Sequence, residues 1–463
     1  MAVQVAGKPI PTFPEPPLIG SMRAFQKDRL GLLLRVMQQC GPVGRIHFGP
    51  FPMLVLSTPE LVQAVLVDHA ADFDKGLALH RAFTPVVGQG LINNEGESWR
   101  HQRKLMAPAF TSRHIAAYAD TMVAYAERAQ QEWATGQELR IDQEMMRLTM
   151  SIVGKTLFDA EVFDESDELG AAVTEAVAFM QYTISHLFPV PLSWPLPRNA
   201  RTRRALAVIA QRLQAMIEER RTAGTDRGDF LSLLLAARDE TGQGMSDEQI
   251  RNEAMTLFLA GHETTANTLS WCWYLLGQNP EVYAKLQQEA DTVLAGRTPT
   301  VADLPNLPYA LQVFKEALRL YPPADSISRT ALRDVDLAGY PLRKNGIIFI
   351  PIYALHRNPM YFPDPERFDP ERFTPENEKR LPRHVYMPFG AGPRICIGNH
   401  FALMEGQLIL ATLAQRVRFE VVAGQHPVPE PVFAVRLGGG CRVIVHRRPW
   451  TEILPRRDEG REE

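Results

Sequence analysis

Hydrophobic residues along this chain recur mainly at helical spacing. In AAYADTMVAYAERAQQEWA, residues 116–134, apolar side chains fall every three or four positions, as on one face of a helix. Residues 200–219 and 402–417 repeat this pattern. Strand-like runs are few and short, and they lie at 44–57, 346–353, 433–437 and 441–446. The pattern predicts a mainly α fold with small β-sheets.

The organisation of the chain indicates one domain. No low-complexity linker divides it, so a single domain over residues 1–463 is expected. Residues 1–20 are proline-rich and should lie extended, and residues 452–463 read as a polar tail. The stretch FPVPLSWPLP at 188–197 is apolar but broken by prolines, so no regular helix is expected there. It would cover a pocket or touch a membrane surface, and an ordinary buried loop is an equally good interpretation.

Composition narrows the class of protein. Hydrophobic residues make up 45% and charged residues 22%, which supports a sizeable core rather than disorder. The formal net charge of -3 argues against nucleic acid as the main partner. The four cysteines lack CxxC spacing, which indicates a reducing compartment rather than a disulfide scaffold. Because residues 1–20 hold no long apolar run, we expect a cytoplasmic protein without a membrane span.

A long buried helix is predicted over residues 246–277. Ser246 and Gln249 have the spacing of a capping box, and the segment is apolar around much of its circumference. The polar segment AGHETT, residues 260–265, interrupts that apolar character. A buried carboxylate is costly without partners, so the interruption needs a reason.

The pattern leaves two interpretations of this interruption open. A zinc motif HExxH is excluded, because Ala266 stands where the second histidine would fall. The first interpretation is a helix kink whose threonines hydrogen-bond back to the helix backbone. The second is a local opening that places the acid Glu263 and the alcohol Thr264 beside a cofactor, since helix distortions often occur at functional sites.

The sequence FGAGPRICIG at 389–398 surrounds Cys396 with turn-forming residues. It is not a dinucleotide fingerprint, because Ile395 stands where the third glycine of GxGxxG would fall. The following helical run places Cys396 just before a helix N-terminus, where the helix dipole stabilises a thiolate. Such a thiolate is a nucleophile or a metal ligand, and no triad-like pattern supports a nucleophile. A single thiolate without neighbouring Cys or His ligands indicates haem iron.

These residues resemble the haem-binding signature FxxGxRxCxG of the cytochrome P-450 family, and the chain is identified as a soluble bacterial-type member. The five fixed positions are Phe389, Gly392, Arg394, Cys396 and Gly398. Further motifs of that family follow in the right order along the chain. They are WxxxR at Trp99 and Arg103, AGxETT at 260–265, ExxR at Glu316 and Arg319, and the second PERF with Arg372 rather than Arg367.

The resemblance implies a cytochrome P-450 fold with haem b between the long central helix and the helix after the cysteine loop. Cys396 would be the axial thiolate ligand of the haem iron, supported by a loop of Phe389, Gly392 and Gly398. The haem propionates would be bound by Trp99, Arg103, Arg329 and Arg394. A structural charge network would comprise Glu316, Arg319 and Arg372.

The resemblance also implies a reaction. A haem-thiolate monooxygenase inserts one oxygen atom from O2 into an apolar substrate, by hydroxylation or epoxidation. Glu263 and Thr264 match the family's acid–alcohol pair, in which the hydroxyl holds a water molecule and the carboxylate relays protons. Peroxide-using members carry arginine and proline in place of that pair, so that alternative is disfavoured. A haem sensor or carrier is disfavoured because no regulatory segment is visible.

Segments equivalent to the family's substrate-contact regions are mostly apolar, including a loop expected at 77–90. A fatty acid or a terpenoid is therefore the expected class of substrate. Arg81, His80 or Asp325 would anchor a polar end of such a substrate. The residues expected to line the pocket are Phe83, Val87, Phe179, Ala260, Ile327 and Phe433.

Electrons are expected from a separate protein, because no flavin, ferredoxin or nicotinamide segment is visible. The source would be NAD(P)H, through a ferredoxin or flavodoxin with its reductase. Basic residues near the cysteine side would steer such an acidic partner, although a solvated basic rim is an equally good interpretation. These residues are Arg100, Arg103, Lys104, Arg113, Lys379, Arg380 and Arg383.

Overall fold

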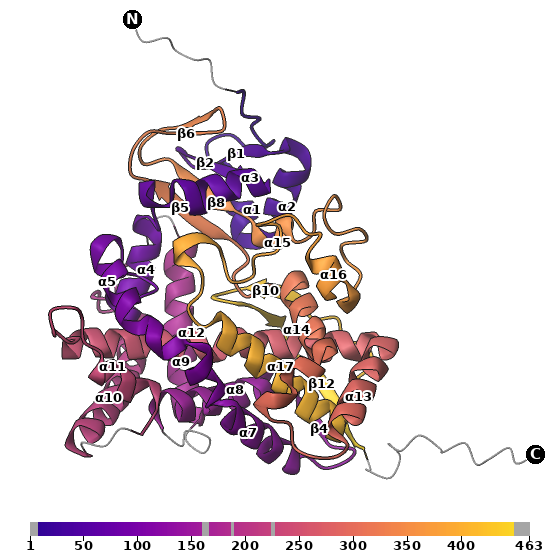
Figure 1. The fold of residues 1–463 in the computed structure, drawn as a ribbon. Coiled ribbons are helices and arrows are strands. Elements are labelled where there is room, and N and C mark those ends of the chain that lie inside the picture. Colours follow the sequence, from indigo (N-terminus) through magenta and orange to yellow (C-terminus); the bar gives the residue numbers. More distant parts are fainter. Residues whose placement is uncertain (1–7, 160–165, 187–188, 224–226, 449–463) are drawn as a thin grey trace, which may run out of the picture.

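The computed structural model describes residues 8–159, 166–186, 189–223 and 227–448, and it consists mainly of helices with small sheets (Figure 1). The mainly α fold class expected from the hydrophobic pattern is confirmed. The expected polar tail at 452–463 lies outside the described residues.

Helices form most of the molecule. The longer ones are α2 (Arg29–Cys40), α7 (Ala119–Gln131), α8 (Ile141–Phe158), α9 (Ser166–Ser185), α10 (Pro197–Ala223), α12 (Asp247–Gln278), α13 (Pro280–Leu294), α14 (Pro308–Leu320) and α17 (Asn399–Arg416). The shorter ones are α1 (Met22–Lys27), α3 (Pro59–Gln63), α4 (Leu77–Val87), α5 (Gly96–Met106), α6 (Ser112–Ala116), α11 (Phe230–Ala236), α15 (Ile352–Leu355) and α16 (Pro375–Glu378).

The strands gather into small sheets, the largest of which lies near one end of the molecule (Figure 1). Its order is β1-β2-β8-β5-β3, and only the β2–β8 pair is parallel. The others are β4-β12-β9, β10-β11 and β6-β7. The strands are β1 (Val43–Phe48), β2 (Phe51–Leu56), β3 (Phe73–Asp74), β4 (Glu138–Arg140), β5 (Ile327–Ala331), β6 (Val335–Leu337), β7 (Tyr340–Leu342), β8 (Ile347–Ile350), β9 (Val417–Val421), β10 (Val428–Pro431), β11 (Val435–Gly438) and β12 (Arg442–Arg447).

Helix α12 connects the two largest apolar clusters. It begins with the predicted capping box: the Gln249 N–H donates to Ser246 Oγ at 3.2 Å, and the Ser246 N–H donates to Gln249 Oε1 at 2.8 Å. Apolar residues of its part 250–259 pack with α8, α9, α10 and α11. Those of its part 266–276 pack with α7, α13, α14 and α17. The polar segment 260–265 therefore lies where the helix passes from one core to the other.

Three local predictions differ from the structure. Residues 77–90, expected as a loop, begin with helix α4, because packing of its apolar face outweighs the helix-breaking tendency of Pro85. The helix expected at 116–134 is shorter than predicted: α7 begins at Ala119, after the end of α6 and a break at 117–118, and it ends at Gln131. The strand expected at 346–353 ends with β8, and α15 follows it directly.

The proline-containing segments lie extended or exposed. Residues 8–20 contain no helix and form isolated bridges to β1, as expected for an extended segment. Residues 189–196 contain no helix either, as predicted. Trp194 is 57% exposed and Leu196 is 39% exposed, so the interpretation of this stretch as a buried loop is wrong.

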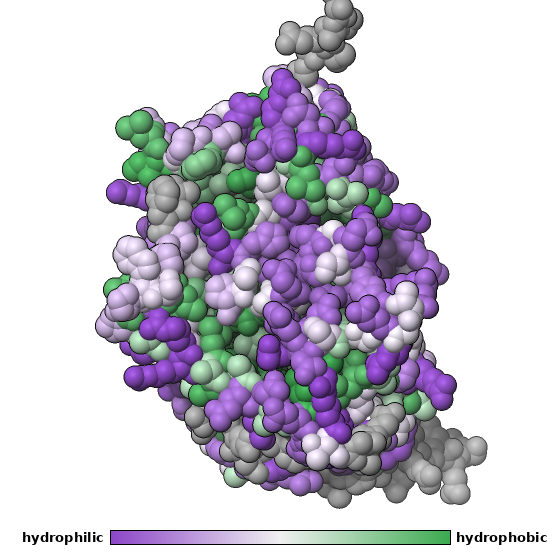
Figure 2. All heavy atoms as spheres, turned by 90° about the vertical axis from the view of Figure 1, so that its left-hand side faces the viewer, coloured by the Kyte–Doolittle hydropathy of each residue, from purple (hydrophilic) through white to green (hydrophobic). Residues whose placement is uncertain are grey.

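Figure 2 views the side that carries α4, α5, α10 and α11, and hydrophilic side chains cover most of it. Hydrophobic side chains gather on this side in smaller groups. Among the described residues, none of the helices combines the length and the apolar character needed to span a lipid bilayer.

Candidate functional site

One face of α12 is left uncovered at its polar segment. Along 253–273 every residue is buried except Ala260, Gly261 and Thr264, which keep part of their surface. Ala260 and Thr264 are about one turn apart and share a face of the helix. Apolar clusters pack along the helix before and after this point. Thr264 thus lies on a partly accessible stretch of an otherwise buried part of the helix, where a ligand could contact it.

The threonines of this segment bond to the helix that carries them. Thr264 Oγ1 donates to the carbonyl oxygen of Ala260 at 2.8 Å, and α12 continues without interruption to Gln278. The threonine back-bonding of the first interpretation of AGHETT is therefore present. The helix is continuous through this segment, so the local opening of the second interpretation is not seen. The uncovered face arises from packing around the helix and not from a break in it.

Glu263 is a buried acid next to that threonine. Glu263 is 6% exposed. Its Oε2 atom has no hydrogen-bond partner among the described residues. Burial raises the pKa of Glu263 to about 7, and the charge of Arg436 offsets this rise only in part. A carboxyl group with that pKa gains and loses protons readily near neutral pH.

The cysteine loop is shaped by two glycines in left-handed backbone conformations. Gly390 has φ +75° and Gly392 has φ +68°. A Cβ atom on Gly392 would lie 1.9 Å from the carbonyl oxygen of Leu66, so a side chain there has no room. The N–H of Cys396 donates to the carbonyl oxygen of Phe389 at 2.9 Å and closes the loop. Gly398 is the N-cap of α17, so Cys396 lies just before a helix N-terminus, as the sequence predicted.

The thiol of Cys396 is influenced by burial and by two neighbouring groups. Burial raises the pKa of its thiol, while the N–H of Gly398 and the charge of Arg103 act in the opposite direction. The residue nevertheless keeps a large accessible surface. The accessible side of this thiol is where a ligand could reach it. A positively charged metal bound there would favour the thiolate form.

Four cationic side chains form a cluster near this loop. Lys75, Arg329 and Arg394 lie around the carboxylate of Glu95, and Arg103 lies near Arg394 and Cys396. Burial is the main cause that lowers the pKa of Lys75 to about 8 and that of Arg394 to about 10. The neighbouring positive charges lower both values further. The cluster is therefore short of negative charge.

The charge of this cluster matches a haem group. Among the described residues, its four cations face two carboxylates, those of Asp74 and Glu95, which leaves two positive charges in excess. A haem carries two propionates, so its binding would balance that excess. The guanidinium of Arg394 stacks on Trp99, with 3.8 Å between its central carbon and the ring centre. The residues present therefore fit a haem bound on the accessible side of Cys396.

The predicted charge network behind the loop is formed by buried side chains. Glu316 and Arg319 are both fully buried and make a bidentate pair, at 2.7 Å and 2.8 Å. Arg372 Nε lies 3.5 Å from Glu316 Oε1, whereas Arg367 contributes only its carbonyl oxygen, to Arg319. The second copy of PERF is thus the one whose side chain approaches Glu316.

The sequence did not reveal that His356 joins this network to the cysteine loop. Its Nδ1 lies 3.2 Å from the carbonyl oxygen of Arg319, and its Nε2 accepts the N–H of Met387 at 3.0 Å. Met387 in turn accepts the N–H of Gly390 at 3.0 Å. Burial and the charge of Arg319 lower the pKa of His356 to about 3, so the ring is neutral and holds these two backbone segments together.

Two further residues near the site were also missed. Lys75 belongs to the cation cluster, but a lone lysine after a short strand carries no recognisable signal. Glu405 lies on α17 and is fully buried. Burial raises its pKa to about 8, and the hydroxyl of Thr265 on α12 offsets this only in part. Neither contact could be read from sequence spacing, because each joins segments far apart in the chain.

The residues expected to line a substrate pocket fall into two groups. Val87 and Phe179 are buried in one apolar cluster, and Phe83 and Phe433 pack against that cluster with their ring centres 6.0 Å apart. Ile327 packs in a different cluster, and its Cδ1 would lie 3.6 Å from a Cβ on Gly390 of the cysteine loop. Ala260 lies on the uncovered face of α12.

Two of the polar residues considered as substrate anchors already have protein partners. Asp325 makes a bidentate pair with Arg29, at 2.7 Å and 2.9 Å, and this pair is mostly buried. His80 Nδ1 lies 2.9 Å from Asn93 Oδ1. Arg81 is exposed. These side chains do not offer a free polar anchor inside the apolar cluster.

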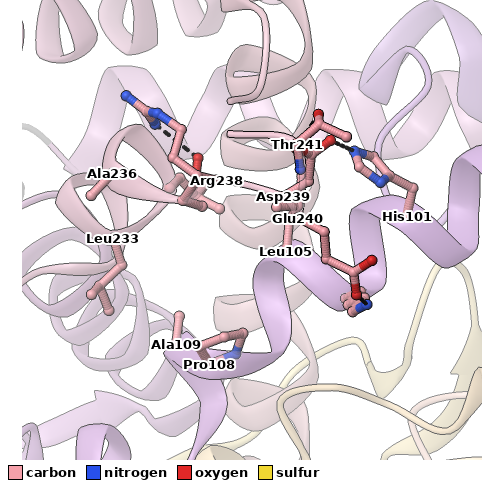
Figure 3. A pocket seen from close by; sticks show the side chains of 13 residues that line it. His101, Leu105, Pro108, Ala109, Leu233, Ala236, Arg238, Asp239, Glu240 and Thr241 are labelled. Carbon is pink, nitrogen blue, oxygen red and sulfur yellow. Dashed lines mark hydrogen bonds and ion pairs between the residues drawn. The ribbon is translucent and has the colours of Figure 1, made fainter. Parts of the chain in front are cut away.

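A surface pocket of about 560 Å³ lies on another side of α5 (Figure 3). At its edge Lys104 pairs with Glu240, and His101 Nε2 lies 3.7 Å from Asp239 Oδ2. On the same helix, Arg103 lies close enough to Cys396 for their charges to interact. Neither Arg103 nor Cys396 lines the surface pocket, which is therefore separate from the cysteine loop.

The fold and the site together define a haem-thiolate protein. A mainly helical chain surrounds a long central helix with one uncovered face, and a closed loop presents a single cysteine beside an excess of cations.

Comparison with known proteins identifies the family. The family described as Cytochrome P450 matches residues 10–437. The chain is 39% identical over 407 residues to cyclooctatin synthase of Streptomyces melanosporofaciens, which covers 86% of this chain and 87% of the relative. It is 38% identical over 413 residues to cyclooctat-9-en-7-ol 5-monooxygenase of the same organism, covering 88% and 89%. It is 35% identical over 418 residues to pentalenene oxygenase of Streptomyces avermitilis, covering 89% and 92%.

The chain therefore belongs to the cytochrome P450 family, and it is a P450 monooxygenase. The predicted resemblance, fold class and class of reaction are confirmed by these matches. Membership implies haem with a thiolate ligand, O2 as co-substrate and electrons from a redox partner. The roles of individual residues remain predictions.

Proposed function

We propose that this monooxygenase hydroxylates a terpenoid. Two similar relatives are named for reactions with cyclooctat-9-en-7-ol and pentalenene, which are terpenoids. In this chain, the proposal rests on the uncovered face of α12 at Ala260 and Thr264, next to an apolar cluster that includes Leu257. A fatty acid is the alternative. It is less favoured because Asp325 and its cation Arg29 already pair with each other.

In the proposed mechanism, bound haem supplies the activation of dioxygen through its thiolate-ligated iron. The residues of the chain bind, orient and protonate. The N–H of Gly398 and the charge of Arg103 temper the negative charge on the Cys396 sulfur. Thr264 Oγ1 has lone pairs left to hold a water molecule on the uncovered face, and the Glu263 carboxyl exchanges protons with solvent.

A titration of the haem-loaded protein tests the substrate class. A terpene hydrocarbon, a terpene alcohol and a saturated fatty acid of equal carbon number would be compared by the shift of the haem Soret band. We expect the terpenoids to shift the band and to yield a product that carries one oxygen atom from labelled O2. A shift with the fatty acid alone would contradict the proposal.

We also propose that a cytoplasmic ferredoxin or flavodoxin, with its reductase, delivers electrons from NAD(P)H. Exposed basic residues including Arg113 and Arg380 favour an acidic partner. Two others are already paired on the surface, Lys104 with Glu240 and Arg100 with Glu97. Because an exposed ion pair is worth little free energy, Lys104 can leave Glu240 and attract the carboxylates of a partner protein.

Charge reversal tests this docking surface. Lys104→Glu and Arg113→Glu should each slow reduction by a ferredoxin about tenfold at low salt, with a smaller effect at high salt. Lys344→Glu, an exposed residue before β8, serves as the matched control. Equal rates for all variants would reject the docking surface and would leave the class of reaction untouched.

A further inference from the structure

Glu95 occupies the centre of the cation cluster that fits the haem propionates. Its Oε1 accepts from the Lys75 ammonium group at 3.0 Å and from the Lys75 backbone N–H at 3.3 Å. Its Oε2 pairs with the guanidinium of Arg394. Arg394 also donates to the carbonyl oxygen of Asn94 at 2.7 Å. Two of the four cations are therefore held by one carboxylate, at the residue that precedes α5.

This ion-pair cluster is shielded from solvent. The side chains of Lys75, Glu95 and Arg394 are 16%, 25% and 18% exposed. Charges in such a setting interact more strongly, and are screened less by salt, than charges on the open surface. A haem propionate would approach the same cations and would carry the same charge as Glu95. The propionate and Glu95 therefore compete for Lys75 and Arg394.

We propose that Glu95 is an internal counter-ion that Lys75 and Arg394 exchange for a haem propionate, so that its charge limits how tightly the chain retains haem. Before haem enters, the single negative charge of Glu95 offsets part of the repulsion among Lys75, Arg394 and Arg329. After haem enters, the carboxylate and the propionates repel one another. Glu95 is thus a positioning residue for the cofactor. This inference rests on the haem site and is independent of the substrate.

Haem loss from the loaded protein tests the inference. Glu95→Gln keeps the size of the side chain and removes its charge. We expect haem transfer to excess apomyoglobin to be about tenfold slower than in the wild type, and added salt should reduce the difference only slightly because the cluster is shielded. Glu97→Gln is the matched control. It makes the same change of charge in the first turn of α5, on a side chain that is 91% exposed, and it should leave the rate unchanged.

Faster haem loss from Glu95→Gln would assign Glu95 a supporting role. If Glu95 only held Arg394 in position for the propionate, its removal would loosen Arg394 and haem would be lost faster. Equal or faster loss from Glu95→Gln would therefore overturn the proposal. Failure of this variant to take up haem, while Glu97→Gln takes it up normally, would overturn it as well.

A double-mutant cycle tests the exchange itself. Lys75→Met should accelerate haem loss by about tenfold, because a partner of the propionate disappears. The same change in the Glu95→Gln background separates two roles of the lysine. Acceleration in both backgrounds supports direct contact between Lys75 and a propionate. Acceleration only when Glu95 is present would mean that Lys75 merely offsets the charge of Glu95. The proposed exchange of Glu95 for a propionate would then be wrong.

Discussion

Thr264 Oγ1 lies 2.8 Å from the carbonyl oxygen of Ala260, on the face of α12 that stays partly accessible within residues 253–273. A hydroxyl has a single proton, and this bond uses it, so the lone pairs of the oxygen remain as acceptors. The predicted catalytic alcohol is therefore oriented by its own helix before any ligand arrives. A rotation about the side-chain bond would be needed before it could donate a proton elsewhere.

Removal of this hydroxyl should separate electron consumption from product formation. Thr264→Ala should bind haem and substrate as the wild type does, because the side chain supports neither. Product formed per NAD(P)H consumed should fall by about tenfold or more, with the electrons recovered as hydrogen peroxide. Coupled measurements of NAD(P)H, peroxide and product check this outcome.

A second threonine of α12 provides the control. Thr268 makes the equivalent bond to the carbonyl oxygen of Thr264 at 2.9 Å but is 1% exposed, away from the uncovered face. Thr268→Ala should keep the yield of product per electron. An unchanged yield in Thr264→Ala would remove the alcohol from the mechanism.

Glu405 should contribute a part of the protein's stability that is lost as the pH rises. Burial raises the pKa of Glu405 to about 8, so the folded state binds its proton more tightly than the unfolded state. The contribution is complete below the ordinary carboxyl pKa and is lost as the pH rises through about 8. The loss amounts to about 1.4 kcal/mol per pH unit at most for a single group. Thermal midpoints between pH 5 and pH 9 should therefore decline less steeply in Glu405→Gln than in the wild type. If the thermal midpoint of Glu405→Gln declined with pH as steeply as that of the wild type, another group would be responsible for the titration. Glu97→Gln, which changes an exposed carboxylate, serves as the control.

The pair of Glu316 and Arg319 should be among the strongest determinants of stability. Glu316→Ala leaves the fully buried Arg319 without its carboxylate, and such a loss costs about 3–5 kcal/mol. Denaturant unfolding of the haem-loaded protein measures this change. Glu371→Ala removes an exposed pair with Lys285 and should cost less than about 1 kcal/mol. Similar values for the two variants would mean that solvent reaches the buried pair.

Gly392 should be required for the shape of the cysteine loop. An alanine Cβ at this position would meet the carbonyl oxygen of Leu66 at 1.9 Å, in a backbone conformation that disfavours side chains. Gly392→Ala should lower the fraction of purified protein that shows the haem-thiolate carbon monoxide band. Gly439 also has a positive φ but has no atom within 4 Å of its Cβ position. Gly439→Ala should therefore keep normal haem content, and equal loss in both variants would contradict a specific role for the approach to Leu66.

The part of the site that follows short-range spacing could be predicted. Ser246 caps α12, Cys396 precedes α17, and Glu316 lies one turn from Arg319, all within a few residues of their partners. Contacts between distant segments could not be predicted in this way. His356 joins the charge network to the cysteine loop through two backbone segments, and Glu95 meets Arg394 across almost three hundred residues of chain.

By itself, the sequence determined the helical character of the chain, the thiolate-bearing loop and the family motifs, because periodicity and local spacing decide hydrogen bonds between near neighbours. Only the tertiary structure decided which face of α12 stays uncovered, that residues 77–87 form a helix, and that Trp194 is exposed. It also decided the environment of the ionisable groups. Burial raises the pKa of Glu263 and lowers that of Lys75, and burial depends on elements that the chain brings together from far apart.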